Sequence, residues 1–215
     1  MNDFNKEDFM IELKKVSKSY GDKVLFHNFD CNIKKGEFVG IKGCSGSGKS
    51  TLLNIMGLLE NCDSGDIIID GEKVDYKDKK KLRKILKTYI GYLFQNFALI
   101  DDFTVLDNLS IGIKGNKKEK INKIKKVLGD LNLNVDLNKK IFKLSGGEQQ
   151  RIAIARLILQ NKSIILADEP TASVDPQNRD IILDLLKKLN KEGKTIILVS
   201  HDDYVIEHTD RVIFL

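Results

Sequence analysis

A glycine-rich loop between an apolar run and an amphipathic segment restricts the possible folds of this chain more than any other feature. The apolar run covers residues 38–41 and the loop covers residues 43–51, and apolar residues then recur at helical spacing over residues 50–59. A buried strand, a glycine-rich loop and a helix in this order form one recurring structural unit. The pattern therefore predicts a strand, a tight turn and a helix that begins at the end of the loop.

The loop has the complete pattern of a phosphate-binding loop. Glycines let successive backbone N–H groups turn inward as a nest for an anion, and the following helix points its positive end at the same place. Lys49 can reach the β- and γ-phosphates of a nucleotide, and Ser50 can ligate Mg²⁺. A glycine-rich turn without a ligand is the alternative, which the complete motif and its context disfavour. We expect a nucleoside triphosphate to bind Gly43, Cys44, Ser45, Gly46, Ser47, Gly48, Lys49, Ser50 and Thr51.

Strands dominate the first third of the chain and helices the middle. Asp70 and Gly71 predict a tight hairpin turn, because this pair tolerates positive φ angles. Residues 97–142 are mostly helical, with an apolar stripe opposite a lysine-rich face. We expect this region to be a helical insertion within a single domain of residues 1–215, followed by a helix that begins near residue 144.

Strands and helices alternate in the last third. Apolar strands are expected over residues 163–167, 195–199 and 211–215, and a helix over residues 176–192 with Asp175 as its cap. Continuous apolar strands separated by helices indicate a parallel sheet covered on both faces.

Two carboxylates end one of these strands. Asp168 and Glu169 come directly after the apolar residues 164–167. At the carboxyl end of a parallel strand they would stand at the ligand crevice of the sheet. Asp168 would hold Mg²⁺, directly or through water, and Glu169 would polarise an attacking water as a general base. Two solvated acids that open a loop are the alternative, which is the weaker one beside a complete phosphate-binding loop.

Composition limits where the protein works and with which partners. The formal net charge is +5, from 36 basic and 31 acidic residues, which is too small to predict nucleic acid binding. Cys31, Cys44 and Cys62 fit neither a disulfide framework nor a zinc site, and they favour a reducing cytosol. No run approaches the ~18 apolar residues that span a bilayer, and residues 1–10 do not have the pattern of a signal peptide. We expect a cytoplasmic protein that reaches a membrane only through another chain.

Residues 144–151, with the sequence LSGGEQQR, predict the start of a helix. Ser145 can cap this helix, and Glu148 completes a capping box. Gly146 and Gly147 leave the backbone N–H groups of the first turn bare, so that the helix end can receive an anion. An ordinary capped helix is the alternative. The string itself argues against it, because it resembles the signature motif of ABC ATPases and precedes the carboxylate-ended strand at the spacing of that family.

Over essentially its whole length the sequence resembles the ATP-binding subunits of ABC transporters. The resemblance implies a P-loop NTPase fold of the α/β class, with a mostly parallel sheet, an N-terminal antiparallel β subdomain and an inserted α-helical subdomain. It implies that Tyr20 stacks on adenine and that Gln95 contacts the nucleotide and its Mg²⁺ and relays the nucleotide state to the helical insertion. Residues 173–175 correspond to the D-loop, in which Val174 stands where leucine is more usual.

The same resemblance implies an ATPase with ATP and Mg²⁺ as its cofactors. Its catalytic residues would be Glu169, His201 and Lys49, with His201 at the γ-phosphate. Signature residues Ser145, Gly146, Gly147 and Glu148 would bind the ATP that is held by a second subunit. We therefore expect a head-to-tail homodimer that forms with ATP and is weak or absent without it.

The expected partner is an integral membrane permease on another chain, and no nucleic acid is expected. The sequence is similar to stand-alone ATPases of the macrolide-export, lipoprotein-release and bacteriocin-export group. Residues 91–101 look most like exporters of bacteriocins or antimicrobial peptides. The expected function is to power export of a peptide, bacteriocin or antibiotic from the inner face of the cell membrane. An ATPase of a cell-division or lipoprotein-release complex, which transmits force instead of exporting a solute, is the alternative.

Overall fold

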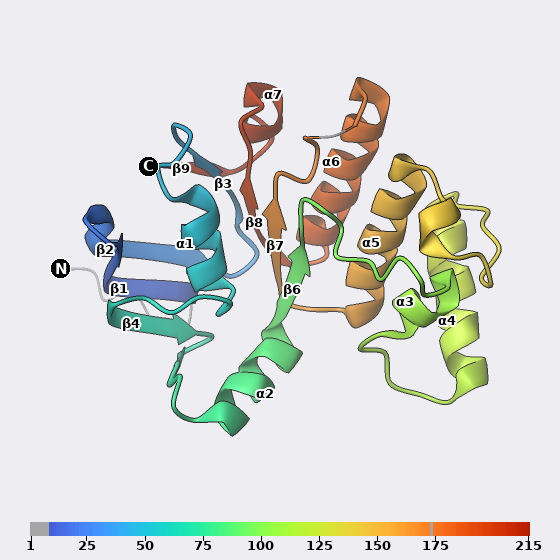
Figure 1. Cartoon of the computed structure of the whole chain (residues 1–215), viewed down its shortest axis with the longest axis horizontal. Coiled ribbons are helices and arrows are strands. Elements are labelled where there is room, and N and C mark those ends of the chain that lie inside the picture. Colours follow the sequence, from blue (N-terminus) through green and yellow to red (C-terminus); the bar gives the residue numbers. More distant parts are fainter. Residues whose placement is uncertain (1–8, 173) are drawn as a thin grey trace.

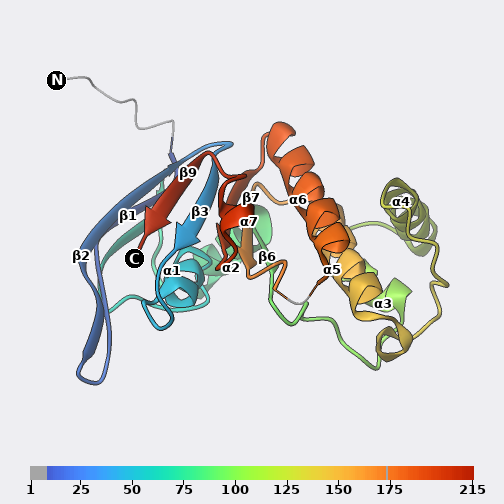
Figure 2. The ribbon, with the colours of Figure 1, turned by 90° about the horizontal axis from the view of Figure 1, so that it is seen from above.

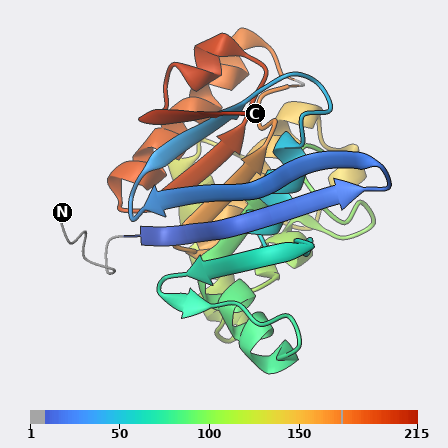
Figure 3. The same ribbon diagram turned by 90° about the vertical axis from the view of Figure 1, so that its left-hand side faces the viewer.

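The computed structural model describes residues 9–172 and 174–215, and its strands form two sheets (Figure 1). The antiparallel sheet contains β1 (Phe9–Tyr20), β2 (Lys23–Lys34), β4 (Ser64–Ile69) and β5 (Glu72–Lys73), in the order β2-β1-β4-β5. The parallel sheet contains β3 (Phe38–Lys42), β6 (Ile90–Leu93), β7 (Ile164–Asp168), β8 (Thr195–Val199) and β9 (Arg211–Phe214), in the order β6-β7-β8-β3-β9. In Figure 3 the long strands β1 and β2 cross in front of the parallel sheet.

Helices cover both faces of the parallel sheet, as the alternating pattern predicts. On the side of the antiparallel sheet lie α1 (Lys49–Met56) and α2 (Lys79–Tyr89). On the other side lie α5 (Gly146–Gln160), α6 (Pro176–Lys191) and the short α7 (Asp203–Ile206), as Figure 2 shows for the two long helices. Beyond α5 lie α3 (Val105–Ser110), α4 (Lys117–Asp130) and the 3₁₀ turn η1 (Ile141–Lys143), within the region expected to be helical.

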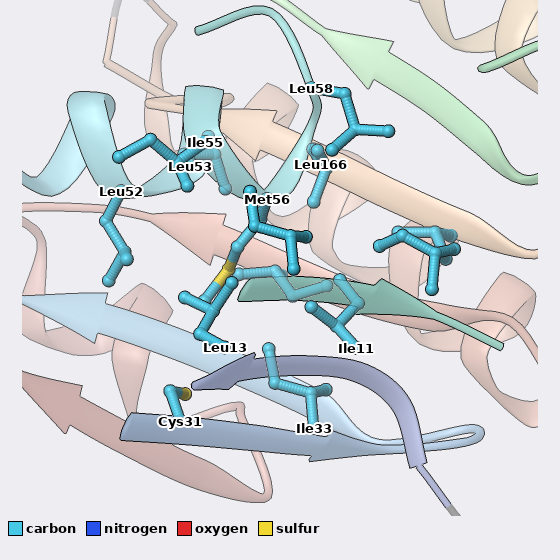
Figure 4. Packing of buried hydrophobic residues seen from close by; sticks show 14 of the residues in the cluster. Ile11, Leu13, Cys31, Ile33, Leu52, Leu53, Ile55, Met56, Leu58 and Leu166 are labelled. Atoms are coloured by element: carbon cyan, nitrogen blue, oxygen red, sulfur yellow. The ribbon is translucent and has the colours of Figure 1, made fainter. Parts of the chain in front are cut away.

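The core consists of layers that meet at the strands of the parallel sheet. Side chains of β7 alternate: Ile164 and Leu166 pack toward the antiparallel sheet, and Ile165 and Ala167 pack toward α5 and α6. Helix α1 is sandwiched between the two sheets, and its apolar residues are fully buried there (Figure 4). This packing holds the start of α1, and therefore the glycine-rich loop, at one end of the parallel sheet.

Two local predictions have different outcomes. Asp70 and Gly71 both have positive φ angles, 48° and 76°, and join β4 to β5, which confirms the predicted primed hairpin turn. The helix predicted over residues 50–59 is too long, because α1 ends at Met56. Leu58 has a left-handed φ of 57°, and Leu59, whose spacing extended the predicted helix, is 54% exposed.

The helices of residues 9–172 and 174–215 include none that is long and apolar enough to cross a bilayer. Residues 1–8, which belong to the N-terminal segment examined for a signal peptide, lie outside the described residues.

Candidate functional site

A cleft of about 940 Å³ opens where the glycine-rich loop meets the carboxyl ends of β7 and β8. This is the edge at which ligands bind in open parallel sheets. Ten of the predicted site residues line it, from five separate parts of the chain: Tyr20, Ser45, Gly46, Gly48, Lys49, Ser50, Thr51, Gln95, Glu169 and His201.

The loop has the backbone shape of an anion nest. Gly46 and Gly48 have φ angles of 75° and 97°, and a side chain on Gly48 would stand 2.9 Å from Phe26 Cζ. Ser47 Oγ is buried and has no hydrogen-bond partner among the described residues. An orphaned hydroxyl at this position suits a ligand with many acceptor oxygens, because a buried polar group is costly unless it is paired.

Lys49 lies at the floor of the loop, and only 6% of its surface is exposed. Its ammonium donates hydrogen bonds to the carbonyl oxygens of Gly43 and Cys44, at 3.0 and 2.9 Å. The loop thus holds a nearly buried cation, with no carboxylate within ion-pair distance in the described part of the chain. Such a charge favours an anionic ligand such as a phosphate.

The two carboxylates have different environments. Asp168 ends β7, and its Oδ1 accepts a hydrogen bond from Ser50 Oγ at 3.1 Å. These are two hard oxygen ligands side by side, the type that Mg²⁺ prefers. Burial raises the pKa of Asp168 above its ordinary value.

Glu169 has a left-handed φ of 46°, which is strained for a residue with a side chain. Its Oε1 is buried, has no hydrogen-bond partner within the described residues, and lies 3.5 Å from His201 Nε2. Its Oε2 accepts a hydrogen bond from the backbone N–H of His201 at 3.4 Å. Burial raises the pKa of Glu169, which makes its carboxylate a stronger base. The arrangement leaves one carboxylate oxygen free to receive a proton from water.

Tyr20 is not a core aromatic: it lines the cleft with 51% of its surface exposed. Gln95 follows β6 and also lines the cleft. Val174 lines the cleft as well, whereas Ser173, the first residue of the expected D-loop, lies outside the described residues. Tyr20, Gln95 and Val174 thus line the same cleft as the loop, from three separate parts of the chain.

The residues of the LSGGEQQR string lie outside this cleft. Ser145 caps α5, and a capping box with Glu148 is present, as predicted: Ser145 Oγ accepts from the Glu148 N–H at 3.3 Å, and Glu148 accepts from the Ser145 N–H at 2.8 Å. Ser145 and Gly146 are exposed. An uncovered helix start with bare N–H groups is therefore available to a ligand held by another molecule.

The sequence matches the family model for the ABC transporter over residues 26–172, which is more than half of the chain. The chain is an ABC transporter ATPase. An uncharacterized ABC transporter ATP-binding protein of Methanocaldococcus jannaschii, MJ0796, is 42% identical over 96% of this chain and 93% of its own length. A dimeric structure of that protein, in a post-hydrolysis state bound to ADP and Pi, has a TM-score of 0.88 to this chain at 41% identity, over 96% of this chain and 94% of that one.

Two other relatives have names that specify a cargo. The lipoprotein-releasing system ATP-binding protein LolD of Aquifex aeolicus is 38% identical over 94% of this chain and 90% of its own length. The macrolide export ATP-binding/permease protein MacB of Escherichia coli is 40% identical over 96% of this chain, which spans only 33% of MacB. The chain is thus an ATP-hydrolysing subunit with the ABC ATPase fold that the sequence predicted.

The structure of this ABC ATPase adds residues that no motif had indicated. Lys23 donates a hydrogen bond to the Gly46 carbonyl oxygen at 2.9 Å and lines the cleft. Arg179 of α6 pairs with Asp202, the residue after His201, at 3.2 Å. Both contacts join segments far apart in the chain, so sequence spacing carries no signal for them.

Proposed function

We propose that this ABC ATPase drives a permease that lies on a separate chain, and that it works as a head-to-tail homodimer. The observation that supports a dimer is that the parts of the ATP site are divided between two places on the chain. The cleft contains the phosphate-binding loop and Glu169, whereas Ser145 and Gly146 are exposed outside it. A second copy supplies the missing side of each ATP site, and the dimeric structures of MJ0796 support this arrangement.

In this proposal the site residues divide the work of ATP hydrolysis. Ser50, Asp168 and Gln95 would hold Mg²⁺, which would neutralise charge on the phosphates. Lys49 and the loop N–H groups bind the phosphates, and Glu169 polarises the attacking water. The separation of 3.5 Å between His201 Nε2 and Glu169 Oε1 supports a joint action of these two at the γ-phosphate.

An exposed apolar surface beside the segment that follows Gln95 supports a docking site for the permease. Ile100, Phe103 and Phe142 are each more than two-fifths exposed. The chain segments that carry them are bonded together, because the Ile141 N–H donates to the Phe103 carbonyl oxygen at 3.1 Å. Exposed apolar patches of this kind mark interaction sites. Through this contact the protein would lie at the inner face of the cell membrane. We further propose that residues 1–215 form one domain, with a helical insertion over residues 97–142.

For the cargo we propose export of a peptide, bacteriocin or antibiotic. Support comes from residues 91–101 and from similarity to MacB, whose name specifies macrolide export. A cell-division or lipoprotein-release complex that transmits force is the second candidate, and similarity to LolD favours it.

Glu169→Gln provides the test of this function. The amide keeps the size of the side chain and cannot take a proton from water, so the variant should bind ATP, hydrolyse it at least about 100-fold more slowly and remain dimeric. The dimer is measured by size-exclusion chromatography with and without ATP. Glu192→Gln, at an exposed position after α6, is the matched control and should behave as wild type.

The trapped variant is then used to recover partners from native membranes with ATP present. Recovery of a multi-span membrane protein, identified by mass spectrometry, is the expected result. The extracytoplasmic part of that protein separates cargo export from force transmission. Normal turnover of Glu169→Gln, or recovery of ribosomes or DNA without any membrane protein, would contradict the proposal.

A further inference from the structure

The end of β1 is tied to the loop after α1 by a dense set of polar contacts. Lys18 Nζ lies 2.9 Å from Glu60 Oε1 and donates to the carbonyl oxygen of Asn61 at 3.0 Å. Asp63 Oδ2 accepts from the backbone N–H of Ser19 at 2.8 Å. Only 12% of the Lys18 side chain and 24% of the Glu60 side chain are exposed. Isolated ion pairs on an open surface contribute little to stability. A network of several contacts that is mostly shielded from solvent holds its side chains in fixed positions.

Tyr20 is the side chain that this network holds. Its phenol donates a hydrogen bond to the Glu60 carboxylate. Lys18 Nζ stands over one face of the ring, 4.9 Å from the centroid. Because an ammonium covers that face, a planar ligand in the cleft has only the opposite face to stack on.

The same network fixes the distance between the ring and the phosphate-binding loop. Helix α1 begins at Lys49 in the loop and ends at Met56, and Glu60 follows shortly after. The backbone N–H of Glu60 donates to the Asn54 carbonyl oxygen of α1 at 3.3 Å, so Glu60 is tied to the helix that carries the loop. The Thr51 side chain, in the first turn of α1, also interacts with the Tyr20 hydroxyl. The ring is thereby held at a set distance from the phosphates.

We propose that Lys18 and Glu60 are positioning residues, which hold Tyr20 as a pre-formed platform for the adenine base. This inference rests on the proposed role of Tyr20 in binding ATP. Neither residue needs to touch the nucleotide. Because they already hold the ring in place, the ring loses less conformational entropy when the base stacks on it. Preorganisation of this kind increases affinity. The pair therefore increases the affinity for the adenine base and does not change the affinity for the phosphates.

Two ligands separate these contributions: ATP, and inorganic tripolyphosphate, which lacks a base. Their Kd values with Mg²⁺ are measured by calorimetry on the full chain. Lys18→Met and Glu60→Ala should weaken ATP binding by about three- to tenfold and leave tripolyphosphate binding unchanged, since base–aromatic stacking is lost only for ATP. In ATPase assays the change should appear in KM and not in kcat. Glu60→Gln, which keeps an acceptor for the phenol, should recover much of the affinity.

Lys14→Met is the matched control. Lys14 also lies on β1 and pairs with a carboxylate, Glu12 at 3.0 Å, but unlike Lys18 it has no contact with the Tyr20 ring among the described residues. It should leave both Kd values unchanged. If Lys18→Met and Glu60→Ala weaken both ligands equally, or neither, the positioning role is wrong.

The variant Tyr20→Ala shows whether a negative result concerns only the positioning role of Lys18 and Glu60 or also the role of Tyr20 in binding ATP. If Tyr20→Ala weakens ATP binding while Lys18→Met and Glu60→Ala do not, only the positioning role is wrong. If Tyr20→Ala leaves ATP affinity intact, Tyr20 does not bind the base and both proposals for this residue are wrong.

Discussion

At the scale of single residues, the cleft combines groups that are costly to hold without a ligand. Lys49 is nearly buried, Ser47 Oγ is unpaired and Glu169 has a left-handed backbone. Each of these features costs free energy in the isolated protein, on the order of 1–3 kcal/mol. Nucleotide binding compensates for the first two, because phosphate oxygens accept hydrogen bonds from both.

Tyr20→Trp provides a direct optical test of base stacking. The chain contains no tryptophan, so the indole at position 20 would be the sole such fluorophore. ATP should quench its fluorescence, because the base stacks on the ring, and tripolyphosphate should not. Equal responses to the two ligands would argue against stacking at this position.

The cysteines allow a second test with thiol reagents. Cys44 is exposed in the phosphate-binding loop, whereas Cys31 is buried and burial raises its pKa to about 11. Below that pH Cys31 remains a protonated thiol, and the thiolate is the reactive form. A maleimide should therefore modify Cys44 first at pH 7, and ATP should slow this modification. Mass spectrometry of peptides identifies the modified site, and early labelling of Cys31 would contradict the burial described above.

At the scale of elements, helix α5, which begins at the signature motif, also contacts the segment that follows Gln95. Arg156 of α5 donates from Nη1 to the Ala98 carbonyl oxygen and from Nη2 to that of Phe97, both at 2.7 Å. Phe97 and Ala98 have φ angles of 62° and 45°, so the two residues are held in a strained backbone conformation. One side chain thus stabilises the turn that lies between the cleft and the helical region.

Replacement of Arg156 should release this turn. Arg156→Met removes two charge-assisted hydrogen bonds, and the free energy of unfolding should fall by about 2–4 kcal/mol. Arg156→Lys should recover only part of the loss, since an ammonium does not reproduce the planar fork. Urea denaturation measures the change. Arg83→Met, at an exposed position on α2, is the control and should change stability by less than about 0.5 kcal/mol.

At the scale of the whole molecule, the two halves of the expected ATP site do not meet within one chain. The cleft is lined by the phosphate-binding loop, whereas the start of α5 does not line it and is exposed to solvent. A substitution at this helix start can therefore impair hydrolysis without damage to the fold. Gly146 is suited to such a substitution, because among the described residues no atom outside its own helical turn lies within 4 Å of an added Cβ.

Mixed subunits should show that the site is shared. Gly146→Asp places a carboxylate where a γ-phosphate would approach, and Lys49→Ala removes the phosphate contact; each variant alone should be inactive. A mixed dimer has one site with both halves intact. An equimolar mixture should therefore recover up to about one quarter of the wild-type ATPase rate, because random pairing makes half of the dimers mixed. Lack of any recovery would contradict the head-to-tail arrangement.

The sequence by itself determined those features that depend on neighbouring residues. The loop at residues 43–51, the capping box of Ser145 and Glu148 and the Asp70–Gly71 turn are each complete within a few positions, so their geometry follows from local backbone preferences. Alternating apolar strands and helices were sufficient to predict the parallel sheet. The end of α1 was mispredicted, because Leu59 has the spacing of a helical residue but lies beyond the helix and is 54% exposed.

Only the tertiary structure decided which distant residues meet. Tyr20 and Glu60 are 40 positions apart, and Arg156 and Ala98 are 58 apart. Such contacts arise because sheet order and helix packing bring separate segments to the same edge, and a single sequence has no periodicity that records them. The resemblance had assigned Glu169 and His201 to one site, but only the structure gives the 3.5 Å between their side chains and the strained backbone of Glu169.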